Sequence, residues 1–184
     1  MGYRLSKIYT RTGDDGTTSL DGKNRIAKNS LAIATLGTID ELNCLIGLTL
    51  TYPFSHTAIR SCFTQIQHDL FDLGGELCLP QHVVIHAEKI LFLEKNLDDW
   101  NNTLPPLKEF VLPGGNQASA TCHLARAVCR RAERCLVGLN EQESINSEIL
   151  RYLNRLSDLL FVAARMLIHE TQGSEVLWEH ERKK

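Results

Sequence analysis

Residues 145–171 read INSEILRYLNRLSDLLFVAARMLIHET and carry the clearest helical signal in the chain. Apolar residues recur every three or four positions, at Ile149, Leu153, Leu156, Leu160, Ala163 and Leu167. Because an α-helix turns once every 3.6 residues, this spacing places them on one stripe. Ser144 or Asn146 can cap the start of the helix, and Gly173 follows its end as a stop signal. We therefore predict one long amphipathic helix here.

Prolines divide the rest of the chain into segments of the same kind. Proline ends helices because it lacks a backbone N–H and restricts the residue before it. Between the prolines we predict further helices near residues 26–51, 55–79, 86–101 and 116–138. No alternating run is long enough to predict a sheet. The pattern therefore predicts an all-α fold, a five-helix bundle in which each helix buries one apolar stripe.

Composition limits the classes of protein to which the chain can belong. A length of 184 residues, with 43% hydrophobic and 23% charged residues, is typical of one soluble globular domain. The net charge of −2 provides no broad basic field, so we expect neither nucleic acid nor a membrane surface as a partner. We expect no secretory signal and no organellar targeting, since residues 1–7 have no apolar run, and no two cysteines have C-x-x-C spacing. We expect buried, reduced thiols and a cytoplasmic protein.

We divide the single domain, residues 1–184, into an N-terminal loop (1–25), a helical bundle (26–171) and a C-terminal tail (172–184). The loop contains TRTGDDGTTSLDGK at 10–23, which is rich in Gly, Thr and Asp and has no helical period. Its glycines permit close backbone approach, and its hydroxyls can donate to phosphates. It is not a Walker A loop, since Asn24 stands where Ser or Thr is required. The alternative to a phosphate-binding loop is a solvated N-terminal arm.

A run of arginines occupies residues 125–134, ARAVCRRAER. On a helix Arg126, Arg130 and Arg134 share a face, with Arg131 beside it. Their guanidinium groups repel one another unless an anion lies against them, and arginine suits a bidentate grip on phosphate. Glu133 can pair with Arg130 or orient it. The alternative is a solvated face with internal ion pairs.

Other polar residues interrupt the apolar stripes. Asn154 and Asp158 are four apart, so we expect both on a core-facing side, where they need a buried network or a ligand as partner. Asp40 repeats this pattern in the first predicted helix. Phe110 precedes an apolar loop, VLPGG, and its ring can either cover an apolar ligand or plug the core. We assign no metal ligands to the protein, because the one suggestive pair of histidines, 82 and 86, lacks a third ligand.

Together these segments resemble the ATP:cob(I)alamin adenosyltransferases of the propanediol-utilisation (PduO) type. The resemblance runs from about Lys7 to Trp178. It rests on five motifs in the family's order, which are KIYTRTGDDG (7–16), GTIDELN (37–43), FVLPGG (110–115), the arginine run and YLNRLSD (152–158). It implies transfer of the 5′-deoxyadenosyl group of ATP to the cobalt of cob(I)alamin, with release of triphosphate. It also implies a homotrimer whose sites lie between subunits.

The resemblance assigns roles to individual residues. The nucleotide would contact Thr10, Arg11, Thr12, Gly13, Thr18, Ser19 and Lys28 of one subunit. The neighbouring subunit would complete the ATP site, with Mg²⁺ on the phosphates, through Arg130, Arg131, Glu133, Arg134 and Asn154. Asp40 and Arg126 would form an intersubunit ion pair beside the corrinoid, and Phe110 would press on its lower face. Asp15 stands where many relatives have Lys.

This chemistry needs no nucleophile from the protein, because cob(I)alamin itself attacks the 5′ carbon of ATP. The protein must orient both substrates and stabilise the leaving triphosphate. A reductase must supply the electron for Co(II), and displacement of the lower axial ligand by Phe110 would ease that reduction. The alternative is a non-catalytic carrier or sensor that serves an adenosylcobalamin-dependent client enzyme. Retention of Phe110 and Asp40 favours the enzyme.

Overall fold

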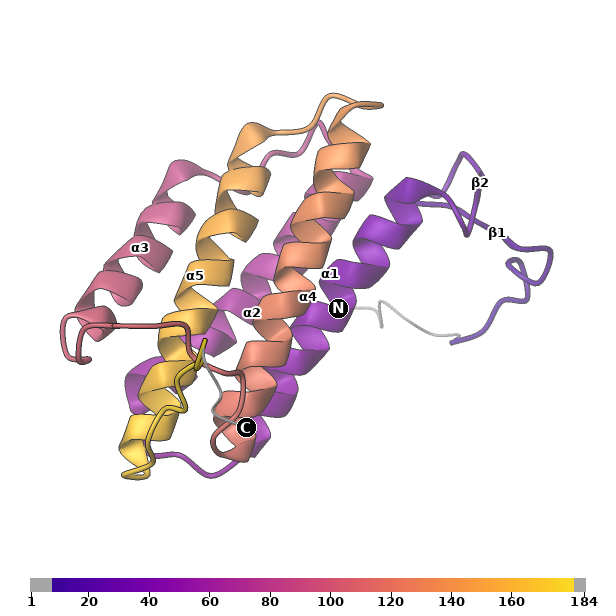
Figure 1. The fold of residues 1–184 in the computed structure, drawn as a ribbon. Coiled ribbons are helices and arrows are strands. Elements are labelled where there is room, and N and C mark those ends of the chain that lie inside the picture. Colours follow the sequence, from indigo (N-terminus) through magenta and orange to yellow (C-terminus); the bar gives the residue numbers. More distant parts are fainter. Residues whose placement is uncertain (1–7, 181–184) are drawn as a thin grey trace.

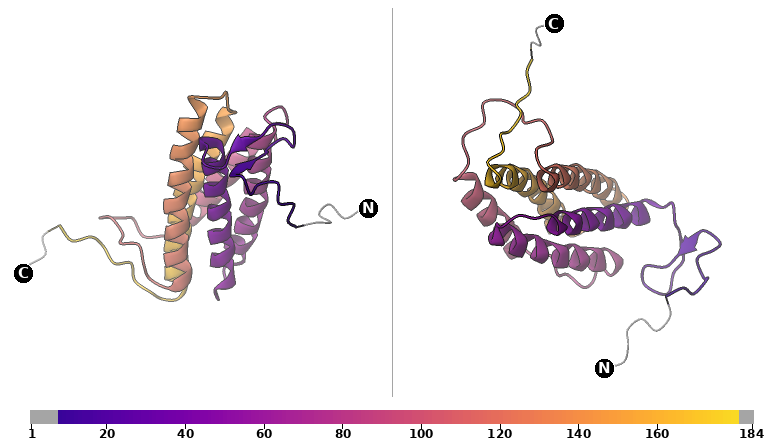
Figure 2. Two further views of the ribbon diagram at one scale, coloured as in Figure 1. Left: turned by 90° about the vertical axis from the view of Figure 1, so that its right-hand side faces the viewer. Right: turned by 90° about the horizontal axis from the view of Figure 1, so that it is seen from below.

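The computed structural model describes residues 8–180 as a bundle of long helices with one small hairpin. The elements, in chain order, are β1 (Thr17–Thr18), β2 (Ile26–Ala27), α1 (Leu31–Thr51), α2 (Thr57–Cys78), α3 (Ala87–Asn101), α4 (Gln117–Asn140) and α5 (Ser147–Glu170). The five helices lie side by side, and the hairpin projects from the start of α1 (Figure 1). Figure 2 shows the hairpin and the C-terminal segment on opposite sides of the bundle. The predicted all-α bundle is confirmed.

The start of the first helix was predicted wrongly. We placed it at residue 26, but Ile26 and Ala27 form a strand that pairs antiparallel with Thr18 and Thr17. Helix α1 begins at Leu31, and Ser30 caps it by accepting a hydrogen bond from the amide of Ile33 at 3.5 Å. A serine cap satisfies a free amide of the first turn and so marks a helix boundary. Ile26 fits the helical period but belongs to the hairpin.

Helices α4 and α5 pack closely along their length. The thiol of Cys122 donates to the carbonyl of Leu160, and that of Cys129 to Leu153, both at 3.2 Å. The pairs are seven residues apart on each helix and run in opposite directions, so the packing is antiparallel. Burial raises the pKa of the Cys62 thiol to about 12. Thus three cysteines are buried as expected, whereas Cys44 is exposed and Cys78 and Cys135 are half-buried.

The segment before α4 is held against the end of α5. Gly115 has a φ of +92°, and a Cβ there would lie 2.5 Å from Cδ1 of Ile168, so only glycine fits. Asn116 caps α4 by accepting from the amide of Ser119 at 2.8 Å. Its own amide group donates to the carbonyl of Leu167 at 2.7 Å. These contacts determine where the loop that carries Phe110 ends.

One buried carboxylate ties three helices together. Asp69 on α2 is 1% exposed and accepts hydrogen bonds from the Tyr152 hydroxyl on α5 at 3.1 Å and from Gln65 at 3.0 Å. It also forms an ion pair with Lys89 on α3. A buried charge is tolerated only when it is paired and hydrogen-bonded, as this one is. Burial and the neighbouring Asp69 raise the pKa of Tyr152 well above its ordinary value.

Helix α1 is the one helix within residues 8–180 that is long and apolar enough to cross a membrane by length and composition. It packs against α2 and α4 in the bundle. Its exposed surface carries Asp40 and Glu41 midway along its length. Charged groups at such a position are costly in a bilayer, which favours a role as a bundle helix.

The Asp69 cluster generates a prediction about stability. Asp69→Ala leaves Lys89 and the Tyr152 hydroxyl without their buried partner and should lower the free energy of unfolding by about 3 kcal/mol. Asp72→Ala is the matched control, because Asp72 is half exposed and binds the same Lys89 at 3.2 Å. We expect it to cost less than about 1 kcal/mol. Urea denaturation at one protomer concentration measures both, and equal losses would contradict a special role for Asp69.

Candidate active site

The N-terminal loop folds on itself around Gly13 and Lys28. The Lys28 ammonium group donates to the carbonyl of Gly13 at 2.8 Å, and the amide of Lys28 to the carbonyl of Gly16 at 2.9 Å. A Cβ on Gly13 would lie 2.9 Å from that ammonium group and 3.1 Å from the carbonyl of Thr17. Glycine therefore lets the lysine side chain lie across the backbone of the predicted phosphate loop.

Two carboxylates organise the same loop. Asp15 accepts from the amide and hydroxyl of Thr17 at 2.9 and 2.7 Å, and these hydrogen bonds lower its pKa. Asp21 accepts from the amides of Lys23 and Asn24, each at 2.8 Å, which lowers its pKa to about 2. Both side chains are charged at neutral pH. The loop is thus internally hydrogen-bonded, which favours an ordered loop over a solvated arm, and Asp15 is one of its organising residues.

The arginines of α4 fall into two groups. Arg131 pairs with Glu41 on α1. Within residues 8–180 no carboxylate forms an ion pair with Arg126, Arg130 or Arg134. Arg134 donates instead to the carbonyl of Arg130 at 3.0 Å. The predicted alternative of a face neutralised by internal ion pairs therefore applies to one of the four arginines, and the other three are available to an anion.

Glu133 and Asn154 meet across α4 and α5. The amide group of Asn154 donates to the Glu133 carboxylate at 2.9 Å. Glu133 therefore contacts Asn154 rather than Arg130. The prediction that Asn154 and Asp158 face the core was wrong, because both side chains are exposed. Four-residue spacing places two residues on one side of a helix but does not say whether that side is buried.

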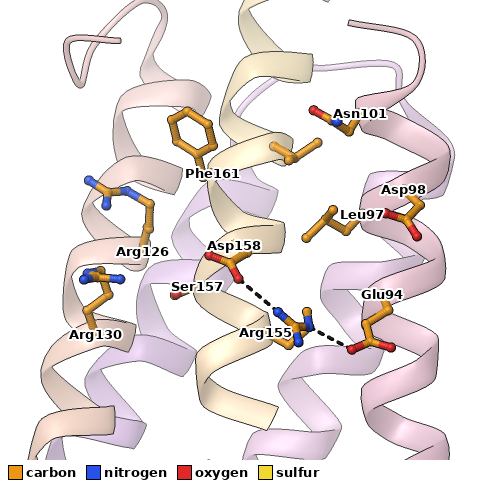
Figure 3. Close-up of a pocket in the computed structure, with 11 residues that line it drawn as sticks. Glu94, Leu97, Asp98, Asn101, Arg126, Arg130, Arg155, Ser157, Asp158 and Phe161 are labelled. Carbon is orange, nitrogen blue, oxygen red and sulfur yellow. Dashed lines mark hydrogen bonds and ion pairs between the residues drawn. The ribbon is translucent and has the colours of Figure 1, made fainter. Parts of the chain in front are cut away.

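A groove between α3, α4 and α5, of about 530 Å³, contains part of this surface. We call it the arginine groove. Figure 3 shows Arg126 and Arg130 on its α4 wall and Phe161 on α5. On the opposite wall Arg155 binds Glu94 of α3 at 2.9 Å and Asp158 at 3.3 Å. Glu94 and Asp158 are therefore already paired, whereas Asp98 of α3 lines the groove without an ion pair among residues 8–180. The open positive charge lies on the α4 wall.

A second, more apolar hollow of about 470 Å³ adjoins the groove. We call it the Phe110 hollow, and its lining residues are Leu107, Glu109, Phe110, Val111, His123, Arg126 and Phe161. Arg126 and Phe161 line both spaces, so the two form one continuous surface. Phe110 is 74% exposed. The alternative that its ring plugs the core is therefore wrong, and the ring stands at the edge of a hollow that fits a flat apolar ligand.

Two buried polar atoms at this surface lack partners within the described part of the chain. They are Nδ1 of His123 and Nε of Arg126. Burial and the neighbouring Arg126 lower the pKa of His123, so its imidazole is neutral at pH 7. Buried polar groups normally have hydrogen-bond partners, and a pair of orphans beside a hollow points to a ligand or a second chain.

One chain does not bring all the predicted site residues together. The loop residues Thr10, Arg11, Thr12, Gly13, Thr18, Ser19 and Lys28 lie in the hairpin region. The arginine groove lies on the face of the bundle away from α1 and α2 (Figures 1 and 3). Over residues 8–180 no hydrogen bond or ion pair joins the loop at 10–28 to α4, and none joins Asp40 to Arg126.

Sequence reasoning missed several residues of this surface. Phe161 and Leu107 line the hollow, and Glu94 and Arg155 form the far wall of the groove. Phe161 follows Asp158 by three positions, which places it one turn farther along the same face of the helix and is the one signal that could have found it. Leu107 and Glu94 reach the site through tertiary packing.

Comparison with known proteins gives one consistent result. A sequence profile of the cobalamin adenosyltransferase family matches residues 8–167. The chain is 53% identical over 182 residues to a cobalamin adenosyltransferase of Cupriavidus metallidurans, covering 99% of each protein. It is 43% identical to the corrinoid adenosyltransferase of Bacillus subtilis, covering 94% of this chain and 92% of that protein.

A solved structure agrees with these relatives. It is a phenylalanine-to-histidine variant of the PduO-type ATP:corrinoid adenosyltransferase from Lactobacillus reuteri, complexed with cobalamin and ATP. It superimposes with a TM-score of 0.89 at 36% identity, over 96% of this chain and 98% of that one. The chain belongs to the cobalamin adenosyltransferase family.

Proposed function

We propose that this enzyme, a corrinoid adenosyltransferase by family, transfers the 5′-deoxyadenosyl group of ATP to the cobalt of cob(I)alamin at the surface formed by the arginine groove and the Phe110 hollow. One observation carries the assignment: Arg126 and Arg130, which have no carboxylate partners among residues 8–180, line a groove that is continuous with an apolar hollow, and an exposed phenylalanine stands at the edge of that hollow. Such a surface matches a polyanion joined to a large, flat, mostly apolar ring system. The family relatives give no support to a non-catalytic carrier or sensor.

The reaction needs two substrates held in line and a stabilised leaving group. The cobalt nucleophile forms a bond to the 5′ carbon of ATP as the bond from that carbon to the triphosphate oxygen breaks. Arg130, with Arg131 and Arg134, stabilises the negative charge that develops on the triphosphate. Lys28 and the hydroxyls of the N-terminal loop hold the nucleotide in the orientation for attack.

Mg²⁺ fits this site as an ion held mainly by the phosphates. Among residues 8–180 no group of three or more His, Cys, Asp or Glu side chains is placed to hold a metal. Mg²⁺ keeps several waters and is usually bound through one or two carboxylates together with substrate phosphates. Glu133, beside the arginines of α4, is the carboxylate that can contribute. The ion would neutralise part of the triphosphate charge.

Phe110 acts on the corrinoid rather than on ATP. Its exposed ring can occupy the space below the corrin plane, displace the lower axial ligand and exclude water. Without that donor the filled axial orbital of Co(I) is less destabilised, so Co(II) is easier to reduce. A reductase partner then supplies the electron in the cytoplasm.

A homotrimer would complete the site. The N-terminal loop and the α4 arginines are separated within one chain, and a closed ring of subunits can bring each loop to a neighbour's α4. The exposed Asp40 would then pair with Arg126 of the neighbouring subunit. The buried, unpartnered Nε of Arg126 supports this arrangement.

Arg130→Ala should abolish turnover while the protein stays folded. Loss of a charge-assisted contact to the leaving group should cost about 2–4 kcal/mol, a fall of roughly 30- to 1,000-fold in kcat/KM for ATP. Arg151→Ala is the matched control, because Arg151 is exposed and pairs with Glu148 away from the groove. Wild-type kinetics in a folded Arg130 variant would place this residue outside the site.

The split site predicts complementation between two inactive variants. Lys28→Ala damages the loop half of each site, and Arg130→Ala damages the α4 half. Co-expressed at equal levels, the two chains should assemble at random, and over all rings about a quarter of the sites should have both halves intact. Activity of the mixture should recover to that fraction, and light scattering should report a trimer. A mixture as inactive as its components would contradict sites built across subunits.

Phe110→Ala should cause a selective defect. Starting from Co(II) with a weak reductant, activity should fall steeply, because the lower ligand or water can return to cobalt. Starting from chemically prepared Co(I), much of the activity should survive, since the nucleophile already exists. Spectra of the Co(II) corrinoid with ATP should lose the four-coordinate signature. Equal losses from both starting states, with that signature intact, would exclude the wedge role.

A further inference from the structure

The C-terminal segment, residues 174–180, runs beside the loop that carries Phe110. The amide of Leu112 donates to the carbonyl of Val176 at 2.8 Å, and the amide of Trp178 to the carbonyl of Phe110 at 2.7 Å. Val111 forms an antiparallel bridge with Leu177 between these two bonds. The rings of Phe110 and Trp178 lie 6.1 Å apart. The C-terminal segment therefore determines where the backbone of Phe110 lies.

One buried side chain fastens both segments to α5. Arg165 is 3% exposed in its side chain. Its Nε and Nη2 donate to the two carboxylate oxygens of Glu175 at 2.5 and 3.2 Å. Nη2 also donates to the carbonyl of Pro105 at 2.8 Å. Pro105 begins the stretch that leads to Phe110, and Glu175 begins the paired C-terminal segment, so a single guanidinium group holds both.

This ion pair does not line the Phe110 hollow itself. Arg165 and Glu175 line a neighbouring cavity of about 160 Å³, which shares Val111 and His123 with the hollow. Neither residue lines the Phe110 hollow. They are therefore placed to act through the loop rather than on a substrate.

A buried bidentate pair is suited to positioning. Apolar contacts tolerate sliding, whereas a guanidinium fork and a carboxylate bind in one preferred relative orientation. Burial makes departure from that orientation costly, because it leaves a charge without a partner. The loop needs such an anchor, since its residues from Pro105 to Lys108 are exposed.

We propose that the Arg165–Glu175 ion pair is the positioning device for Phe110. It holds the C-terminal segment against the loop so that the phenylalanine ring stands at the edge of the hollow. This inference rests on the proposed wedge role of Phe110 and deepens it. Arg165 and Glu175 are positioning residues, and reduction of Co(II) corrinoid depends on them, while adenosylation of preformed Co(I) does not.

The test uses Glu175→Gln in the full chain, with Glu148→Gln as control. The control makes the same chemical change in a half-buried glutamate, whose partner Arg151 is exposed. Without corrinoid, amide hydrogen exchange should accelerate over residues 107–112 and 174–180 and stay unchanged in α4 and α5. A displacement of about 1 Å can cost up to a hundredfold, so we expect Co(II)-dependent activity to fall about ten- to a hundredfold. Activity from Co(I) should stay within about twofold of wild type.

A second variant, Arg165→Lys, and a reference variant, Phe110→Ala, distinguish failure of the positioning role from failure of the wedge role. Arg165→Lys keeps the charge but not the fork, and should give the same selective defect if the geometry matters. Unchanged exchange in both segments, or uniform loss of both activities with faster exchange throughout the helices, would overturn the proposal. A third result would also overturn it. In that case Glu175→Gln accelerates exchange in the loop but keeps the wild-type ratio of Co(II)-dependent to Co(I)-dependent activity, although Phe110→Ala changes that ratio. If Phe110→Ala leaves the ratio unchanged, the wedge role fails, and the exchange data alone decide whether the pair positions the loop.

Discussion

The close antiparallel packing of α4 on α5 is the constraint on which the rest of the structure depends. Small side chains and two thiol-to-carbonyl hydrogen bonds, from Cys122 and Cys129, allow the helices to approach along their length. This packing sets Arg126 beside Phe161 and brings Glu133 to Asn154. It also brings the start of α4 to the end of α5. There Gly115 has no side chain, which leaves room for the side chain of Ile168. That contact determines where the Phe110 loop ends.

Electrostatics then divide the surface. The chain carries a net charge of −2, yet one wall of the arginine groove presents guanidinium groups without carboxylate partners. Of the acids across the groove, Glu94 and Asp158 are paired with Arg155, whose pKa is raised above its ordinary value, first by its hydrogen bond to Glu94. Because surface charges are screened within about 10 Å, the local arrangement rather than the total charge governs anion binding. A net acidic protein can therefore hold a triphosphate.

The proposed chemistry follows from positioning more than from reactive side chains. The corrinoid provides the nucleophile, so the protein contributes orientation, charge stabilisation and control of the cobalt ligands. The Phe110 hollow, the arginine groove and the loop around Lys28 serve these three tasks. Each depends on contacts between distant parts of the chain, and for the loop the proposed partner is another subunit.

Much of the helical fold could be predicted from local patterns, because periodicity and caps depend on residues within about four positions of each other. Asn146 as a cap, the arginines of α4 on a shared face and the Gly-rich loop belong to this class. Ile26 was misassigned, since an apolar residue before a capping serine fits both a helix and a hairpin. The prediction that the Asn154 side chain faces the core was also wrong, because spacing alone does not identify the buried side of a helix.

Only the tertiary structure decided the exposure of Phe110, the neighbourhood of Phe161 and the burial of Arg165. In the sequence Arg165 is a charge within an apolar stripe, and its partners Glu175 and Pro105 lie ten and sixty residues away. Which distant segments meet depends on how whole helices pack, and that choice minimises the free energy of the complete core rather than of any local segment.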